Sequence, residues 1–313
     1  MRATGISNGK IILMGEHSVV YGEPAIAIPF LATAIETKIE TTNGPVLLDC
    51  FFYKGPLTQA PKRLLNLITV ISETVKKLNK PLENFDITIT STIPAERGMG
   101  SSAAVAVATI RALFHYFEAS LSNDVLLELT NISETIAHGN PSGLDAAMTS
   151  SNSPLYYVKG QEFELFPLEV TAYIVVADTG ITGQTKEAVE NIAQLYLTVP
   201  EKTDQSIKQL GQLAKQAKLA IEQDQASELG DYMTQAHKIL NSLDVSNQEL
   251  NNLVQTALES GALGAKLTGG GRGGCMIALA KNKSTANQLA KDLSKAGAQH
   301  TWIYNMGKGE QDA

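Results

Sequence analysis

The segment PAERGMGSSAAVAVATIRALF joins a polar, glycine-containing loop to an almost entirely apolar run. The run predicts a buried helix that is entered through the loop. The amides of a first helical turn lack intrahelical partners and the helix dipole is positive there, so this entrance can bind a phosphate. Gly98 and Gly100 would let the backbone approach a phosphate closely, and Ser101 or Ser102 would add a hydroxyl. A second interpretation is that Ser101 simply caps a core helix and the glycines make the turn.

A second chemical stretch is GKIILMGEHSVVYGEPAIA, in which a predicted strand ends at Gly15 and is followed by Glu16 and His17. A carboxylate and an imidazole at a strand end can hydrogen-bond a hydroxylated substrate, although such a pair in a surface loop can also be merely solvated. Lys10 stands at the start of this strand, which favours a functional lysine over an ordinary surface one. The alternative for Lys10 is an aliphatic stem that lies along a sheet edge with its amine in water.

The stretch SETIAHGNPSGLDAAM carries two carboxylates, Glu134 on a predicted helix and Asp145 at the start of the next one. The turn between them reverses the chain, so both side chains can face the same place. One carboxylate could then bind a metal while the other meets a substrate hydroxyl. In the alternative interpretation, Asp145 only offsets a helix N-terminus and Glu134 faces solvent.

The last such stretch, KLTGGGRGGCMIAL, places five glycines around Arg272 before a predicted buried strand. Each glycine adds conformational entropy to the unfolded chain, so an ordinary hairpin would not need so many. Close approach of the backbone to a ligand is the more economical explanation.

The elements that must position these residues are of mixed type. Enrichment in β-branched residues, or alternation of apolar and polar residues, predicts strands in GKIILMG, AIAIPFLATAIETKIETT, FDITITST, AYIVVAD, CMIALA and TWIYNM. Apolar residues at helical spacing predict helices in PKRLLNLITVISETVKKLN, NDVLLELTNISETIAHG, SIKQLGQLAKQAKLAIEQ, LGDYMTQAHKILNSL, NQELNNLVQTALES and Ser284–Ala296. In the helix that ends at Gly139, we expect Ile136 on the buried side. A shift in composition after residue 160 places a domain boundary near Pro154 to Pro167 and predicts two α+β domains, residues 1–160 and 161–313. A small-molecule site is expected between two such domains.

The composition excludes several classes of protein. A net charge of −7 without a basic face argues against a nucleic-acid partner, and no run of about 18 uncharged apolar residues is present to cross a membrane. Two cysteines, Cys50 and Cys275, form neither a disulfide framework nor a zinc motif, which suits the cytoplasm. If the ligand is a phosphate compound, the basic residues to follow against this acidic background are Lys10, Arg97, Lys186 and Arg272.

Together, GKIILMGEHSVVYG, PAERGMGSSAA and KLTGGGRGGC resemble the three ordered motifs of the GHMP kinases, the family named for its galactose, homoserine, mevalonate and phosphomevalonate kinases. Within this family, GEH followed by VVYG and PAIA, and also HGNPSGLD, resemble the members that phosphorylate mevalonate. Members that act on galactose would carry an aspartate where Val19 stands. The resemblance implies a two-domain α+β fold with a ribosomal-S5-like N-terminal domain and a ferredoxin-like C-terminal domain. It also implies that ATP and Mg²⁺ bind between the domains.

The resemblance further implies a role for each matching residue. Asp145 would be the catalytic carboxylate beside Lys10, and Glu16 and His17 would contact mevalonate together with them. Ser102 and Glu134 would bind Mg²⁺. The ATP-binding set would be Gly98, Met99, Gly100, Ser101, Ser102, Ala103 and Thr185, and the loop from Gly269 through Gly270 and Gly271 to Gly274 would help close the site. Arg97 stands where many members of the family carry a small residue, so no inherited role is implied for it.

Other functions stay open at this stage. A kinase for phosphomevalonate, homoserine or a sugar would share the phosphate loop and differ in the acceptor pocket. A sensor that binds ATP or a metabolite without catalysis could use the same scaffold, although it could dispense with at least one of Lys10, Ser102, Glu134 and Asp145. A homodimer is also open.

Overall fold

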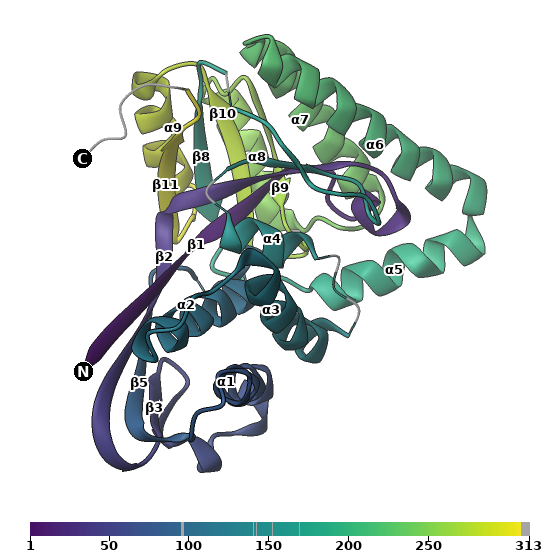
Figure 1. Ribbon diagram of the computed structural model, residues 1–313. Coiled ribbons are helices and arrows are strands. Elements are labelled where there is room, and N and C mark those ends of the chain that lie inside the picture. The colour runs from purple at the N-terminus through teal and green to yellow at the C-terminus, as the bar shows by residue number, and fades with distance from the viewer. Residues whose placement is uncertain (95–96, 140, 142, 152, 169, 308–313) are drawn as a thin grey trace. The chain divides into compact units, whose positions relative to one another are not determined.

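The protein consists of two compact units, each assembled from separate stretches of the chain. The computed structural model describes residues 1–94, 97–139, 141, 143–151, 153–168 and 170–307 (Figure 1). Unit 1 comprises Met1–Lys10, Pro29–Pro94 and Gly100–Asn152, and unit 2 comprises Ile11–Ile28, Ala95–Met99 and Ser153–Ala313. The sequence-based division after residue 160 stays a prediction.

The sheet of unit 1 has the strand order β4-β3-β5-β2, and β1 also pairs with β2. Its strands are β1 (Arg2–Met14), β2 (Ala25–Pro45), β3 (Leu47–Cys50), β4 (Tyr53–Pro56) and β5 (Glu83–Ser91). In β2 and β5, alternate residues are buried and the intervening ones are polar, as expected for strands with one face on a core. The first residues of β1 and β2 belong to different units from their last residues, so each of these strands supplies side chains to both.

The helices of unit 1 are α1 (Leu65–Lys77), α2 (Ser101–Tyr116), α3 (Asn123–His138) and α4 (Leu144–Ser150), preceded by short 3-10 turns at Leu57–Gln59 and Lys62–Leu64. Helix α2 packs tightly on β1, because a Cβ at Gly5 would lie 2.1 Å from the carbonyl oxygen of Ala108. Its apolar residues Val107, Ile110 and Leu113 are fully buried. This burial holds the start of α2 in a fixed place on the sheet.

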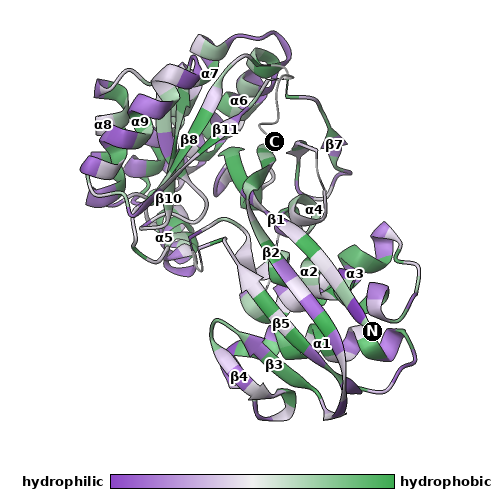
Figure 2. Ribbon diagram, turned by 90° about the vertical axis from the view of Figure 1, so that its left-hand side faces the viewer, coloured by the Kyte–Doolittle hydropathy of each residue, from purple (hydrophilic) through white to green (hydrophobic). Residues whose placement is uncertain are grey.

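The main sheet of unit 2 is antiparallel, in the order β11-β8-β10-β9. Its strands are β8 (Tyr173–Asp178), β9 (Gly264–Thr268), β10 (Cys275–Ala280) and β11 (His300–Asn305), and the short strands β6 (Leu155–Tyr157) and β7 (Glu164–Leu165) extend from the beginning of β2. All residues of β9 and β10 are buried, which fits the continuous apolar sequence of β10, whereas β9 also buries Lys266 and Thr268. Figure 2 shows the hydrophobic colouring of β8 against the more hydrophilic surfaces of α8 and α9.

The helices of unit 2 are α5 (Thr185–Thr198), α6 (Pro200–Glu222), α7 (Ala226–Ser242), α8 (Gln248–Glu259) and α9 (Lys283–Lys295), with a 3-10 turn η1 at Ser18–Tyr21. Helices α7 and α8 pack against β9, and α9 packs against β8 and β11. Helix α6 packs between α5 and α7 and also contacts η1. Among the described residues, no helix has both the length and the apolar character that a membrane crossing would need.

The predicted mixture of strands and helices is confirmed, with two local corrections. Strand β1 begins at Arg2, so Lys10 lies inside the strand and not at its start. On α3, Ile136 is 40% exposed, whereas Ser133 and Glu134 are buried. The buried face of α3 is therefore partly polar, which an apolar periodicity cannot reveal.

Candidate active site

Lys10 and Asp145 form an ion pair in unit 1. The Lys10 side chain is only 3% exposed, and its Nζ lies 3.1 Å from Oδ1 of Asp145. Asp145 occupies the first turn of α4, two residues after the N-cap Gly143, whose φ of 82° is left-handed, and its side chain remains 35% exposed. Burial excludes the sheet-edge interpretation of Lys10. The pair thus presents an accessible carboxylate supported by a buried cation.

The start of α2 lies directly against Lys10. Gly100 is the N-cap of the helix with a φ of +72°, and a Cβ at this position would lie 2.8 Å from Cγ of Lys10 and 3.3 Å from Cγ2 of Thr149. Only glycine fits both the conformation and the space. Since the N-cap is Gly100, which has no side chain, the interpretation of Ser101 as the cap is wrong. The first amides of α2 therefore receive no hydrogen bond from an N-cap side chain.

Glu134 lies on α3 within the same unit and is only 2% exposed, so the interpretation that it faces solvent is wrong. Burial and the negative charge of Asp145 raise its pKa, while a hydrogen bond from Ser102 and the charges of His138 and Lys10 oppose the rise. Within the described residues, its Oε1 is buried and has no hydrogen-bond partner. The two carboxylates and a hydroxyl therefore form an oxygen-rich group with excess negative charge.

Asn66 on α1 forms hydrogen bonds with two serine hydroxyls next to Glu134. Its Nδ2 donates to the hydroxyl oxygens of Ser102, at 3.3 Å, and of Ser133, at 3.4 Å. Ser102 can therefore receive a hydrogen bond from Asn66 and donate one to Glu134. Asn66 was not singled out from the sequence, because an asparagine within an amphipathic helix carries no distinctive pattern.

In unit 2, Glu16 forms a buried ion pair with Lys266, a residue that sequence reasoning missed. Nζ of Lys266 donates to Oε1 of Glu16 and, at 2.6 Å, to the carbonyl oxygen of Leu267. The side chains of Lys266 and Glu16 are 0% and 1% exposed. Burial lowers the pKa of Lys266, and Glu16 opposes this effect. The available signal was the isolated lysine in the apolar strand that precedes the glycine-rich loop.

His17 follows Glu16 and adopts a left-handed φ of 61°. Its Nε2 lies 3.1 Å from the carbonyl oxygen of Gly270, which can only accept, so Nε2 carries the proton and donates. Burial lowers the pKa of His17 to about 4, and the charges of Lys266 and Arg272 act in the same direction. The ring is therefore neutral near pH 7. Its Nδ1 is a buried acceptor without a hydrogen-bond partner in the described part of the chain.

The glycine-rich loop packs against the phosphate-loop residues of its own unit. A Cβ on Gly269 would lie 2.9 Å from Cα of Gly98, and one on Gly98 would lie 3.2 Å from Cα of Gly269. A Cβ on Gly270 would lie within bonding distance of Oγ1 of Thr185, at the start of α5. These glycines are thus required because three backbones and a hydroxyl meet with no space for side chains.

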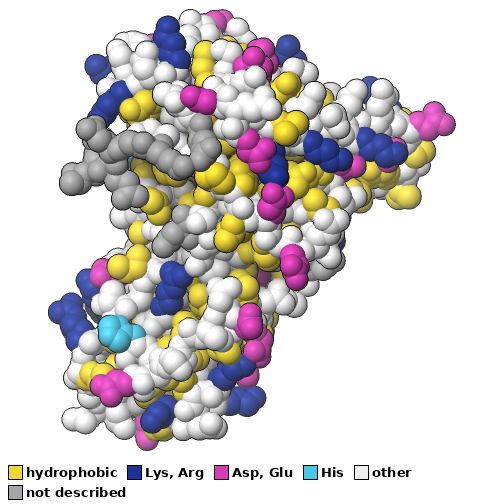
Figure 3. All heavy atoms as spheres, turned by 45° about the horizontal axis from the view of Figure 1, so that its top comes forward, with side chains coloured by type: hydrophobic (Ala, Val, Ile, Leu, Met, Phe, Trp, Pro, Cys, Tyr) yellow, Lys and Arg dark blue, Asp and Glu magenta, His cyan; other side chains and the backbone are white. Residues whose placement is uncertain are grey.

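The basic residues proposed from the sequence are engaged in different ways. Arg97 pairs with Asp178 at 3.0 Å, Arg272 pairs with Asp244, and Lys186 lies on the surface of α5 with its side chain 84% exposed. On the face that Figure 3 shows, lysines and arginines are interspersed with acidic residues and form no basic stripe. Of the four basic candidates, Lys10 is the one that forms an ion pair with the proposed catalytic carboxylate, Asp145.

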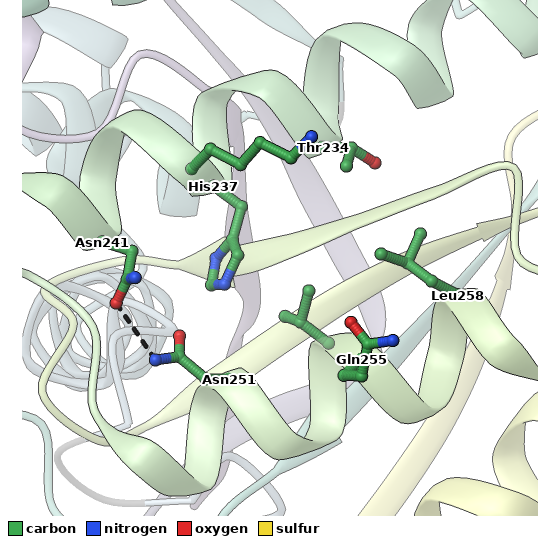
Figure 4. Close-up of a pocket in the computed structure, with 8 residues that line it drawn as sticks. Thr234, His237, Asn241, Asn251, Gln255 and Leu258 are labelled. Atoms are coloured by element: carbon green, nitrogen blue, oxygen red, sulfur yellow. Dashed lines mark hydrogen bonds between the residues drawn. The ribbon is translucent and has the colours of Figure 1, made fainter.

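A cavity of about 260 Å³ lies between α7 and α8 in unit 2 (Figure 4). His237 faces it and accepts a hydrogen bond from the amide of Leu267 at 3.3 Å, while Asn241 and Asn251 bond to each other across it. None of the residues proposed from the sequence lines this cavity. Asn140 and Ser142 of the HGNPSGLD stretch lie outside the described residues.

Comparison with known proteins identifies the family. Profiles described as "GHMP kinases N terminal domain" and "GHMP kinases C terminal" match residues 66–152 and 217–299. A mevalonate kinase from Thermococcus sibiricus is 36% identical, in an alignment that covers 95% of this chain and 94% of the relative. The chain belongs to the GHMP kinase family. The membership that the three motifs predicted is thereby confirmed by an alignment over nearly the whole chain.

Two solved structures agree with this membership. The crystal structure of mevalonate kinase from methicillin-resistant Staphylococcus aureus MRSA252 is 37% identical, with a TM-score of 0.73, and covers 98% of this chain and 99% of its own. The structure of L. major mevalonate kinase in complex with R-mevalonate is 26% identical, with a TM-score of 0.83, and covers 97% and 95%. The predicted two-domain GHMP kinase fold is confirmed.

Proposed function

We propose that this GHMP kinase transfers the γ-phosphoryl group of ATP to the primary hydroxyl of mevalonate, giving 5-phosphomevalonate and ADP. Two full-length relatives at 36% and 37% identity carry the name mevalonate kinase, and a similar structure holds R-mevalonate. Within the site, the observation that carries the proposal is the ion pair of buried Lys10 with accessible Asp145. It provides a base for an alcohol without any covalent nucleophile.

In the proposed reaction, Asp145 accepts the proton of the primary hydroxyl. The hydroxyl oxygen then forms a bond to the γ-phosphorus of ATP, while the bond between this phosphorus and the β–γ bridging oxygen breaks and ADP leaves. Lys10 forms an ion pair with Asp145 and would offset negative charge on the transferring group. The work of the protein is thus mainly alignment and charge compensation.

The ATP phosphates are assigned to the loop of Gly98, Met99, Gly100, Ser101, Ser102 and Ala103. The reason is that α2 begins at Ser101 after a glycine N-cap, which offers its first amides no side-chain acceptor, and the helix is anchored by its buried apolar face. Thr185 begins α5 and is exposed, so its hydroxyl is a further candidate for a phosphate oxygen. Gly269, Gly270 and Gly271 would help to close the site over the nucleotide.

Mg²⁺ is assigned to Ser102 and Glu134. Among the described residues, no cluster of three or more histidines, cysteines or acidic residues suits a metal. Mg²⁺, however, needs only one or two carboxylates when phosphates and waters supply the other ligands. The unpartnered, buried Oε1 of Glu134 and its raised pKa fit such an ion, because a cation there would relieve a desolvated negative charge. When bound, the ion would neutralise charge on the β- and γ-phosphates.

The acceptor is assigned to Glu16 and His17, together with Lys10 and Asp145. Nδ1 of neutral His17 is a buried acceptor that suits a hydroxyl donor, and the carboxylate of Glu16 is fixed by Lys266. Mevalonate offers two hydroxyls and one carboxylate, so a hydroxyl and not its carboxylate should face these groups.

A coupled assay of ADP release across a panel of acceptors tests this function. We expect mevalonate to give the highest kcat/KM, with phosphomevalonate, homoserine and galactose at least about 100-fold lower, because polar groups of the acceptor pocket would be left unpaired. Preference for another acceptor would assign the chain to a different branch of the family. Nucleotide binding without turnover of any acceptor would favour the sensor. A cytoplasmic location and a homodimer stay predictions.

A further inference from the structure

Arg97 immediately precedes the glycine loop and is held firmly within unit 2. Its side chain is 17% exposed, and its Nε forms an ion pair at 3.0 Å with Oδ1 of Asp178, which is 4% exposed. Its Nη1 donates to Oγ1 of Thr182 at 3.0 Å, and its Nη2 donates to the carbonyl oxygen of Gly180 at 2.8 Å. Both Nη atoms are therefore hydrogen-bonded to residues 180 and 182, while the contact of Nε with Asp178 is an ion pair without a hydrogen bond.

This segment is itself tied to the glycine-rich loop. Asp178 ends β8, and its Oδ1 also accepts a hydrogen bond from the amide of Gly180 at 2.9 Å. The hydroxyl of Thr179 donates to the carbonyl oxygen of Gly274 at 2.7 Å, and the amide of Gly274 donates to that of Ile181 at 2.7 Å. Residues 178–182 thus connect Arg97 to the loop that ends at Gly274.

The backbone next to Arg97 completes the arrangement. A Cβ on Gly274 would lie 2.8 Å from the carbonyl oxygen of Arg97, and Gly98 packs on Gly269. Arg97 and its neighbour therefore contact both ends of the glycine-rich loop. A guanidinium is suited to this task because its planar fork holds several acceptors in one geometry, which an ammonium cannot reproduce.

We propose that Arg97 is a positioning residue, which fixes the entrance of the phosphate loop through Asp178 and residues 180–182 and does not itself contact the phosphates. The proposal rests on the assignment of the Gly98–Ala103 loop to ATP. It follows that nucleotide affinity depends on the pair of Arg97 and Asp178 as a unit.

A double-mutant cycle tests this coupling. The variants are Arg97→Met, Asp178→Asn and the double variant, and the readout is the dissociation constant of Mg²⁺ with the non-hydrolysable ATP analogue AMPPNP, measured by calorimetry without acceptor. We expect each single variant to weaken binding about 10-fold and the double variant to be no weaker than the single ones, because both remove one interaction. The KM for the acceptor should stay within about twofold.

Two further variants sharpen the cycle. Arg97→Lys keeps the charge but cannot reach three acceptors, so it should bind AMPPNP as weakly as Arg97→Met. Thr182→Val removes one contact at an exposed residue and should have a smaller effect in the same direction, which keeps the test usable if Arg97→Met does not fold. Arg2→Met is the matched control, since Arg2 pairs with Glu40 on the surface with 64% of its side chain exposed.

Three results would overturn the proposal. Weak binding in Arg97→Met with normal binding in Asp178→Asn, or restored binding in Arg97→Lys, would indicate a direct contact with the phosphates. A lowered Tm with unchanged nucleotide affinity would indicate a purely structural ion pair.

Failure of the proposed function is a separate outcome. If the wild type binds AMPPNP but phosphorylates no alcohol, the proposed function fails while the cycle still tests Arg97.

Discussion

At the scale of single residues, Lys10 and Lys266 show what burial does to a charged side chain. Both lysines lie within strands and both are paired with a carboxylate, Lys10 with Asp145 and Lys266 with Glu16. Removing one partner of such a pair leaves an uncompensated charge out of water, which typically costs about 3–5 kcal/mol. Replacing a carboxylate by an amide of the same shape is milder when the carboxylate is still partly exposed, as it is in Asp145.

Asp145→Asn therefore separates chemistry from stability. The amide cannot accept a proton from an alcohol, so we expect kcat to fall by about 10²–10⁴-fold while Mg²⁺-AMPPNP affinity stays near that of the wild type. The measurement is single-turnover phosphoryl transfer beside calorimetric binding of the nucleotide. A folded variant with normal turnover would remove Asp145 from the mechanism.

Glu134→Gln addresses the metal. The substitution removes a desolvated charge, so thermal stability should not fall, whereas the Mg²⁺ concentration for half-maximal activity should rise about 10-fold or more. Activity is titrated with Mg²⁺ at fixed ATP, and Tm is recorded on the same sample. Ser102→Ala should act in the same direction. If a lower Tm accounted for the loss of activity in both variants, Glu134 and Ser102 would have a structural role only.

The residue types at these positions were predictable, but most of their partners were not. Lys10, Ser102, Glu134 and Asp145 lie in motifs with a recognisable order, and the structure brings all four together in unit 1. Lys266 pairs with Glu16 across 250 residues of sequence, and no local pattern reports such a contact. Ile136 was expected inside and lies outside, because the buried face of α3 changes from Leu126 and Leu129 to the polar residues Thr130, Ser133 and Glu134 toward its C-terminal end.

At the scale of elements, the glycine-rich loop between β9 and β10 acts through close packing of its backbone rather than through its side chains. Gly98 and Gly269 both have positive φ, of 79° and 80°, and their backbones pack directly on each other. The number of glycines was a sufficient sequence signal for a close approach. The partner in that approach could not be predicted, since here it is another backbone of the same protein.

Gly269→Ala should disturb this contact. Its Cβ would lie 2.9 Å from Cα of Gly98 and would also strain the backbone, so we expect kcat/KM for ATP to fall at least about 10-fold. Gly297→Ala is a matched control, because Gly297 has a φ of +110° but open space around its Cβ position. Steady-state kinetics of the two variants are compared at equal fractions folded. Equal losses in both would indicate backbone strain alone.

At the scale of the whole molecule, two buried histidines make stability depend on pH. The pKa values of His17 and His237 are lowered from 6.5 to about 4, mainly by burial. In the unfolded chain both would take up protons below about pH 6.5, whereas the folded protein takes them up only near pH 4. The unfolded state therefore binds more protons between these values, and stability falls as the pH falls through this window.

We expect the free energy of unfolding to drop by up to about 3 kcal/mol per histidine between pH 7 and pH 4. Urea titrations at a series of pH values measure this directly. In His237→Gln, the free energy of unfolding should depend less steeply on pH, because the side chain no longer titrates. The unfolding free energies of this variant and of the wild type at neutral pH are compared first. An unchanged slope in that variant would assign the pH dependence to other groups.

The division of unit 2 along the chain has a consequence for biosynthesis. The hydroxyl of Thr268 in β9 donates to the carbonyl oxygen of Ile12 in β1 at 2.8 Å, and Glu16 must meet Lys266. A ribosome therefore has to release more than 250 residues before Ile12 and Glu16 can meet these two partners. Unit 2 can therefore be completed only late in synthesis, although its first segment is among the earliest to leave the ribosome.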